Sequence, residues 1–80
     1  MSEASDKIRM FILEELLFED PDATITDETP LLGGIIDSLG LMQLVAFIEE
    51  TFEVQIADGD ITSTNFRSVA DIDRLLARGE

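Results

Sequence analysis

The sequence predicts an all-α fold, a small bundle of three main helices plus one short helix, with a long ordered loop between the first and second helices. Apolar residues recur at helical intervals in three separate segments. No long segment alternates between apolar and polar residues, as the strands of a half-buried sheet would. At 80 residues, the chain is expected to form a single domain, residues 1–80, whose core is near the lower limit of sufficient size.

The first helix is expected at residues 5–18, where Ser5 can cap the N-terminus and Asp6 suits the first turn. Its apolar residues repeat every three or four positions, which is the spacing of an amphipathic helix. They are Ile8, Phe11, Ile12 and Leu16.

Residues 19–37 are predicted to form a loop, because Pro21, Pro30 and the pair Gly33 and Gly34 oppose a continuous helix. The glycines are interpreted as residues that let the chain turn tightly before the next helix. Four apolar side chains can anchor the loop to the core: Ile25, Leu31, Leu32 and Ile35. We therefore expect an ordered loop, and ordered loops of this length are commonly functional.

The second helix is predicted at residues 38–52, with Asp37 or Ser38 as its N-cap. Its core face is formed by Leu41, Leu44, Val45, Ile48 and Phe52. A second stripe is formed by Leu39, Met42 and Ala46, followed by Glu49 and Glu50. The periodicity alone favours burial of this second stripe, and the alternative is an exposed docking strip bordered by acid. Gly40 lowers the stability of a helix by about 1 kcal/mol relative to alanine. The glycine therefore indicates a requirement at this position other than helix propensity.

The short helix is expected within residues 61–66, which are too polar and too few for more than a turn or two. Before it, residues 53–60 form a connection from which Val54 and Ile56 are expected to reach the core.

The third main helix is predicted at residues 68–77. Ser68 can cap it, and Asp71 stands three residues later in a variant of the capping box. Its apolar face is formed by Val69, Ile72, Leu75 and Leu76.

The absence of histidine and cysteine excludes a Ser-His-Asp triad, a cysteine nucleophile and the usual structural zinc sites. An enzyme is therefore not expected, and no catalytic or metal-binding residue is assigned. The sequence DGD at residues 58–60 resembles the start of a calcium loop. Its sixth and twelfth positions would be Ser63 and Val69 instead of Gly and Glu, so it is interpreted as a turn.

The net charge of −13, from 18 acidic and 5 basic residues, argues against a nucleic-acid partner, which requires a basic surface. The acidity fits either a well-solvated surface or one that steers the protein toward basic partners, and composition leaves both open. No apolar run is long enough to span a membrane. The sequence begins without a secretory signal and lacks cysteine, so a cytoplasmic location is expected.

Ser38 has two interpretations. The sequence IDSLG around it lacks the first glycine of a nucleophile elbow, and the chain has no histidine to act as base. Local rules favour a helix cap. A helix N-terminus also stabilises a phosphate ester through its free N–H groups and dipole, so Ser38 could instead be modified by another protein.

The segment LLGGIIDSLGLMQLVAFIEETFEVQI resembles the signature of acyl carrier proteins. It has a glycine-containing loop, Asp-Ser-Leu, and an amphipathic helix that ends in Glu-Glu and an aromatic residue. The resemblance extends over nearly the whole chain, including its acidity and the S-V-x-x-I pattern at residues 68–72. In that family the serine receives 4′-phosphopantetheine from coenzyme A, and the terminal thiol of this arm holds acyl or aminoacyl groups as thioesters.

The resemblance implies that Ser38 is the attachment site and that Asp37 faces incoming enzymes. It also implies a docking role for the second stripe: Leu39, Met42, Ala46, Glu49 and Glu50. The implied partners are a phosphopantetheinyl transferase, an acyl- or aminoacyl-activating ligase and downstream acyl-transfer enzymes. The protein is expected to act as a monomer.

Three residues depart from the pattern of fatty-acid-synthase carriers. Gly40 and Gln43 stand where those carriers often have acids, and Ala57 stands where they often have proline. The run GIIDSLGLMQLV is more similar to stand-alone D-alanyl, aminoacyl or peptidyl carriers, and to carriers of specialised pathways. The alternative from another class is an acidic helical interaction or inhibitor protein.

Overall fold

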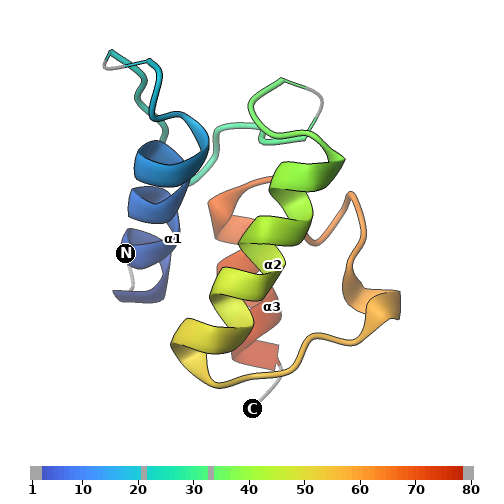
Figure 1. Ribbon diagram of the computed structural model, residues 1–80. Helices are drawn as coiled ribbons and strands as arrows, with labels where there is room; N and C mark the ends of the chain where they lie inside the picture. The colour runs from blue at the N-terminus through green and yellow to red at the C-terminus, as the bar shows by residue number, and fades with distance from the viewer. Residues whose placement is uncertain (1–2, 21, 33, 79–80) are drawn as a thin grey trace.

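The fold consists mainly of three α-helices (Figure 1), and side chains from all three form a shared apolar core. The computed structural model describes residues 3–20, 22–32 and 34–78. Along the chain, the elements are α1 (Glu3–Phe11), a π-helix η1 (Ile12–Leu16), α2 (Ser38–Phe52), a 3-10 helix η2 (Asp58–Asp60) and α3 (Val69–Arg78). The described residues form no strand, only an isolated bridge between Leu32 and Ile36, so the all-α prediction is confirmed. None of the helices in these residues is both long and apolar enough to cross a membrane.

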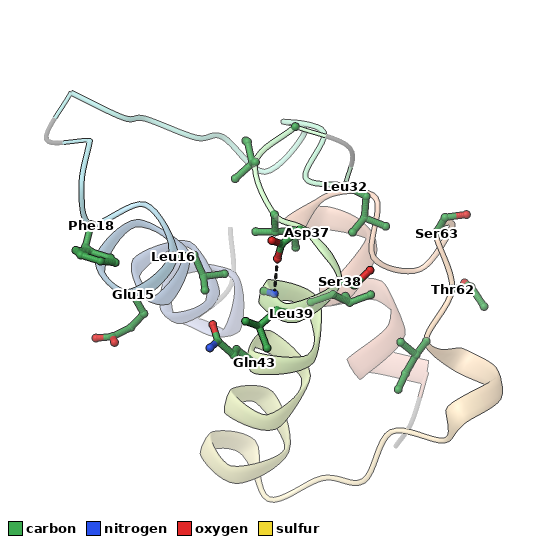
Figure 2. Close-up of a pocket in the computed structure, with 16 residues that line it drawn as sticks. Glu15, Leu16, Phe18, Leu32, Asp37, Ser38, Leu39, Gln43, Thr62 and Ser63 are labelled. Carbon is green, nitrogen blue, oxygen red and sulfur yellow. Dashed lines mark hydrogen bonds between the residues drawn. The ribbon is translucent and has the colours of Figure 1, made fainter.

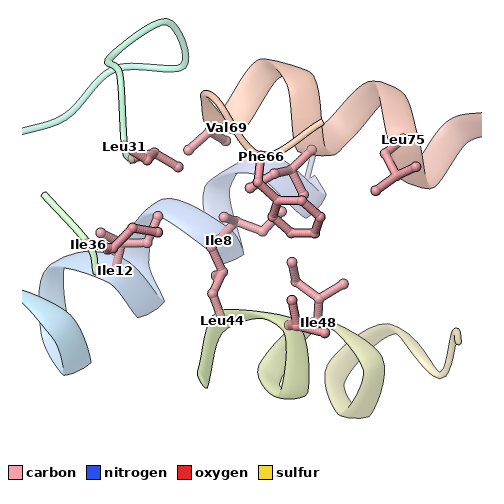
Figure 3. Close-up of a cluster of buried hydrophobic side chains, with 11 residues drawn as sticks. Ile8, Ile12, Leu31, Ile36, Leu44, Ile48, Phe66, Val69 and Leu75 are labelled. Atoms are coloured by element: carbon pink, nitrogen blue, oxygen red, sulfur yellow. The ribbon is translucent and has the colours of Figure 1, made fainter. Parts of the chain in front are cut away.

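The core lies where the apolar faces of α1, α2 and α3 meet (Figure 3). Its buried side chains are Ile8, Ile12, Leu31, Ile36, Leu44, Val45, Ile48, Phe66, Val69, Ile72 and Leu75. Each predicted helix contributes residues from its expected face. Ile36 and Phe66 were not predicted, and Phe66 is the largest of the fully buried side chains.

The first helical segment begins and ends two residues earlier than predicted. Ser5 lies inside α1 and is only 1% exposed, so its predicted role as N-cap is wrong. Glu3 extends the helix in the N-terminal direction, because its carboxylate suits the first turn and pairs with Lys7 at 3.7 Å. At the other end, the Leu17 N–H donates to the Ile12 carbonyl, five residues earlier, at 2.9 Å.

The long loop is anchored to α1 and to the start of α3, as its apolar residues predicted. The Leu31 N–H donates to the Arg67 carbonyl at 2.8 Å, and Leu31 is fully buried. The Ala70 N–H donates to the Asp27 carbonyl at 2.9 Å, and the Asp27 carboxylate forms an ion pair with Arg9.

The predicted pair of turn glycines is only partly described, because Gly33 lies outside the described residues. Gly34 lies in a turn, as expected. A Cβ there would meet no atom within 4 Å, so no close approach of other atoms requires glycine at this position.

The predicted short helix at residues 61–66 is replaced by η2 (Asp58–Asp60) and a single turn closed by the Phe66 N–H and the Thr62 carbonyl at 3.0 Å. Side-chain hydrogen bonds favour this turn. The Asn65 N–H donates to Thr62 Oγ1 at 3.1 Å, and Asn65 Nδ2 donates to the Asp60 carbonyl at 2.9 Å. Such local bonds compete with helix formation.

Ser68 caps α3 as predicted, but Asp71 reaches back to the Ser68 hydroxyl instead of the Ser68 backbone N–H that a capping box uses. The Asp71 N–H donates to Ser68 Oγ at 3.3 Å, and the Ser68 hydroxyl donates to Asp71 Oδ2 at 2.8 Å. The Asp71 carboxylate also accepts hydrogen bonds from Arg74 and Arg67. These contacts, that of Arg74 above all, lower the pKa of Asp71 from 3.8 to about 2, although burial opposes the shift.

The lowered pKa predicts a pH-dependent contribution of Asp71 to stability. Its pKa is lower in the folded than in the unfolded state, so the ionised carboxylate stabilises the fold above about pH 4, and this contribution fades toward about pH 2. Asp71→Asn should lower the free energy of unfolding by about 1 kcal/mol near neutral pH, since both arginines are largely exposed. Urea unfolding should be measured between neutral pH and about pH 2 for the unaltered protein and for Asp71→Asn. The difference between their free energies of unfolding should shrink toward pH 2, and a difference that is constant with pH would contradict the prediction.

Candidate functional site

Asp37 caps the N-terminus of α2. Its backbone is extended, and Asp37 Oδ1 accepts a hydrogen bond from the Gly40 N–H at 2.8 Å. The helix begins at Ser38 and ends at Phe52, as predicted. Of the two N-caps that the sequence left open, the structure selects Asp37, and the Ser38 hydroxyl is not used as a cap.

Gly40 allows this cap to form against a tightly packed neighbour. A Cβ on Gly40 would lie 3.2 Å from the Ile36 Cβ and 3.4 Å from Asp37 Oδ1. The first turn of α2 therefore lies so close to Ile36 that a side chain at position 40 would be crowded. This contact explains a glycine that helix propensity disfavours.

The Ser38 side chain is exposed at the positive end of the α2 dipole. Within the described residues, its hydroxyl has no hydrogen-bond partner. Figure 2 shows the hydroxyl directed away from the helix, on the side of Thr62 and Ser63, whereas Leu39 and Gln43 lie toward η1. Ser38 thus presents a free hydroxyl beside backbone N–H groups that favour an anion.

An open groove of about 940 Å³ surrounds this end of α2 (Figure 2). Four segments line it: the end of η1, the loop before α2, the first turns of α2 and the connection after η2. Its polar side chains are Glu15, Asp37, Ser38, Gln43, Thr62 and Ser63. Its apolar side chains are Leu16, Phe18, Leu32, Ile35, Ile36, Leu39, Leu41 and Ile61.

The second stripe of α2 is exposed, so the burial favoured by periodicity alone is wrong. Leu39 is 68% exposed and Met42 is 55% exposed, and both Ala46 and Glu50 are exposed. The opposite face of α2 already supplies its buried residues, and no other element covers the second stripe within the described part of the chain.

Glu49 differs from the rest of that stripe because it is half-buried and has a structural contact. Glu49 Oε2 accepts a hydrogen bond from the Ile56 N–H at 2.8 Å, which ties the connection after α2 to the helix. The resemblance to acyl carrier proteins placed Glu49 among the docking positions, and no sequence signal indicated this contact.

The acidity is concentrated in the middle of the chain. Residues 10–66 contain thirteen acidic residues and no lysine or arginine, so they account for the whole net charge. These residues include α2 and every wall of the groove. Two of these acidic residues, Glu15 and Asp37, line the groove beside Ser38.

A protein-family model described as a phosphopantetheine attachment site matches residues 6–72, which include the N-terminus of α2 and the whole groove. The chain belongs to the phosphopantetheine-binding carrier family. The predicted cofactor, 4′-phosphopantetheine in covalent attachment, is confirmed by this membership. Carrier domains of this family interact with partner enzymes and are generally non-catalytic themselves.

The end of α2 fits a phosphate-containing arm in this carrier. Apart from the Gly40 N–H, which Asp37 binds, the N–H groups of the first turn suit a phosphodiester, and the Ser38 side chain is exposed. The groove offers polar and apolar walls to a chain that contains both kinds of group.

Several groove residues were not identified from the sequence. Gln43 was noted only for departing from fatty-acid-synthase carriers, and Phe18 was placed in the first helix without a role. The available signal for Phe18 was an aromatic residue among acids, in EELLFED, beyond the apolar face of that helix. Its position in the groove that Leu39 also lines depends on tertiary structure.

Proposed function

We propose that the protein is an acyl carrier whose Ser38 hydroxyl bears the 4′-phosphopantetheine arm, and that it acts as a cytoplasmic monomer. The observation that carries the proposal is the cap of α2. Because Asp37 binds the Gly40 N–H, Ser38 keeps an unused, exposed hydroxyl at the helix N-terminus.

The residues around Ser38 have separate roles in this proposal. When bound, the arm supplies a terminal thiol that holds acyl or aminoacyl groups as thioesters, in a chain without cysteine. The N–H groups of the first turn of α2 stabilise the negative charge of the phosphodiester. Asp37 holds the first turn in place and, as an exposed carboxylate, faces incoming enzymes.

The exposed stripe of α2 supports docking of partner enzymes in this proposal. Leu39, Met42 and Ala46 provide the apolar contact, and Glu50 provides charge at its far end. We assign Glu49 a smaller part, since one of its oxygens is engaged by Ile56. The partners are a phosphopantetheinyl transferase, an activating ligase and downstream acyl-transfer enzymes, all bound by weak, charge-assisted contacts that permit exchange.

The cargo is proposed to be an aminoacyl or related small acyl group, as in D-alanyl and aminoacyl carriers. The support is the resemblance of the GIIDSLGLMQLV run to such carriers. Gly40 and Gln43 make the first half of α2 less acidic than in fatty-acid-synthase carriers.

Thiol titration tests the proposal, because the chain contains no cysteine. The purified protein should contain no reactive thiol before treatment. After incubation with coenzyme A and a broad-specificity phosphopantetheinyl transferase, followed by removal of coenzyme A, it should contain one thiol per chain. Intact-mass measurement should show one added arm, and an unchanged mass with no thiol would contradict the proposal.

A further inference from the structure

Phe18 is a large exposed apolar side chain outside the stripe of α2. It lies two residues after η1 and is 67% exposed. Phe18 and Leu39 line the same groove from different elements, with Leu16 between them in Figure 2. Ser38 lines that groove too, so Phe18, Leu39 and the proposed attachment site border the same groove.

The backbone around Phe18 is hydrogen-bonded on both sides. The Leu17 N–H donates to the Ile12 carbonyl in the π-helical turn, and the Asp20 N–H donates to the Leu17 carbonyl at 3.0 Å. Single π-helical turns are frequent at functional sites. These bonds present Phe18 from an ordered turn, which reduces the entropy lost when a partner binds.

Carboxylates accompany Phe18 along the chain. Glu14, Glu15, Glu19 and Asp20 lie within four residues of it, and no lysine or arginine occurs between residues 10 and 66. A second copy of this chain would bring like charges together at this surface. A partner with an apolar side chain flanked by lysine or arginine would match both the aromatic ring and the charge.

We propose that Phe18 and Leu39 form a composite docking surface for partner enzymes that present an apolar side chain flanked by basic residues. The inference rests on the proposed function, because the first such partner is the phosphopantetheinyl transferase that must reach Ser38. Phe18 extends the docking surface beyond α2, across the groove to the turn after η1.

Binding without modification tests this surface. Proteins carrying Ser38→Ala are titrated by calorimetry with a purified broad-specificity phosphopantetheinyl transferase. Phe18→Glu in this background should raise the Kd at least about tenfold, as loss of an aromatic interface anchor commonly does. Phe18→Ala should raise it several-fold, and added salt should weaken binding of the unaltered surface.

Met10→Glu is the matched control, since Met10 is 59% exposed on α1 and does not line the groove. It should change the Kd less than about twofold, and thermal unfolding should confirm that all variants fold. An unchanged Kd for Phe18→Glu, equal weakening by Met10→Glu, or absence of binding would overturn the inference. A dimer seen by sedimentation and dissociated by Phe18→Glu would also overturn the inference, because a second copy of the chain would then occupy this surface. Failure of the proposed function would give a different result: a protein that retains Ser38 would gain no arm after treatment with the transferase and coenzyme A.

Discussion

Phe66→Ala is expected to destabilise the protein by about 3–5 kcal/mol, the usual cost of removing a buried aromatic ring. Phe66 is fully buried, and Figure 3 shows its ring in the space enclosed by the three helices. A chain of 80 residues has a total stability of roughly 4–12 kcal/mol. Self-repulsion from a net charge of −13 reduces the margin further. We therefore expect the variant to be largely unfolded at low ionic strength.

Urea unfolding followed by circular dichroism measures this loss, with added salt if the variant needs it to fold. Phe18→Ala is the matched control, because it removes the same ring from a position that is 67% exposed. It should change the free energy of unfolding by no more than about 0.5 kcal/mol. A loss below about 1 kcal/mol for Phe66→Ala would contradict the core described here.

The helices with strong local signals were predicted best. Helix α2 has its predicted bounds, and α3 follows its predicted cap, because Asp37 and Ser68 each bond to a backbone N–H three residues later. Such contacts depend only on residues close together in sequence. At α1, Ser5 matched the same rule but lies inside the helix, since residues on both sides of it are also compatible with a helix.

Features that depend on tertiary contacts were not predictable in the same way. Phe66 stands in a polar segment, and its burial follows from the packing of α1 and α2, which are distant in sequence, together with α3. Exposure of Leu39 and Met42 follows from the absence of a described element over that face of α2, which periodicity does not reveal. The π-helical turn before Phe18 likewise has no recognisable sequence signal.

The sequence predicts Ser38 as the site residue, but it does not predict the geometry around it. The lack of histidine argued against a catalytic triad at Ser38, and the resemblance to acyl carrier proteins implied its modification. Whether Ser38 or Asp37 capped the helix was decided by a single hydrogen bond, from the Gly40 N–H to Asp37 Oδ1. The groove brings residues 15–18, 32–43 and 61–63 together, and local sequence rules do not predict contacts between such separate stretches.

Ser38→Ala is expected to abolish attachment of the arm completely, because the change removes the only atom proposed to bond to the phosphate. The fold should be unaffected, since Asp37 caps α2 and the Ser38 hydroxyl is exposed. Ser63→Ala removes an exposed hydroxyl from the same groove and should be modified as efficiently as the unaltered protein. An acidic interaction or inhibitor protein would instead gain no arm, and its complexes would be indifferent to Ser38→Ala.

Locating the added mass tests the central claim most directly. The treated protein is cleaved after glutamate, because residues 10–66 contain no site for a protease that cleaves after lysine or arginine. Cleavage after Glu28 and Glu49 releases residues 29–49, in which Thr29 and Ser38 are the only hydroxyl-bearing residues. Tandem mass spectrometry of this peptide should place one phosphopantetheine arm on Ser38. An arm on Thr29 or on any other peptide would contradict the account.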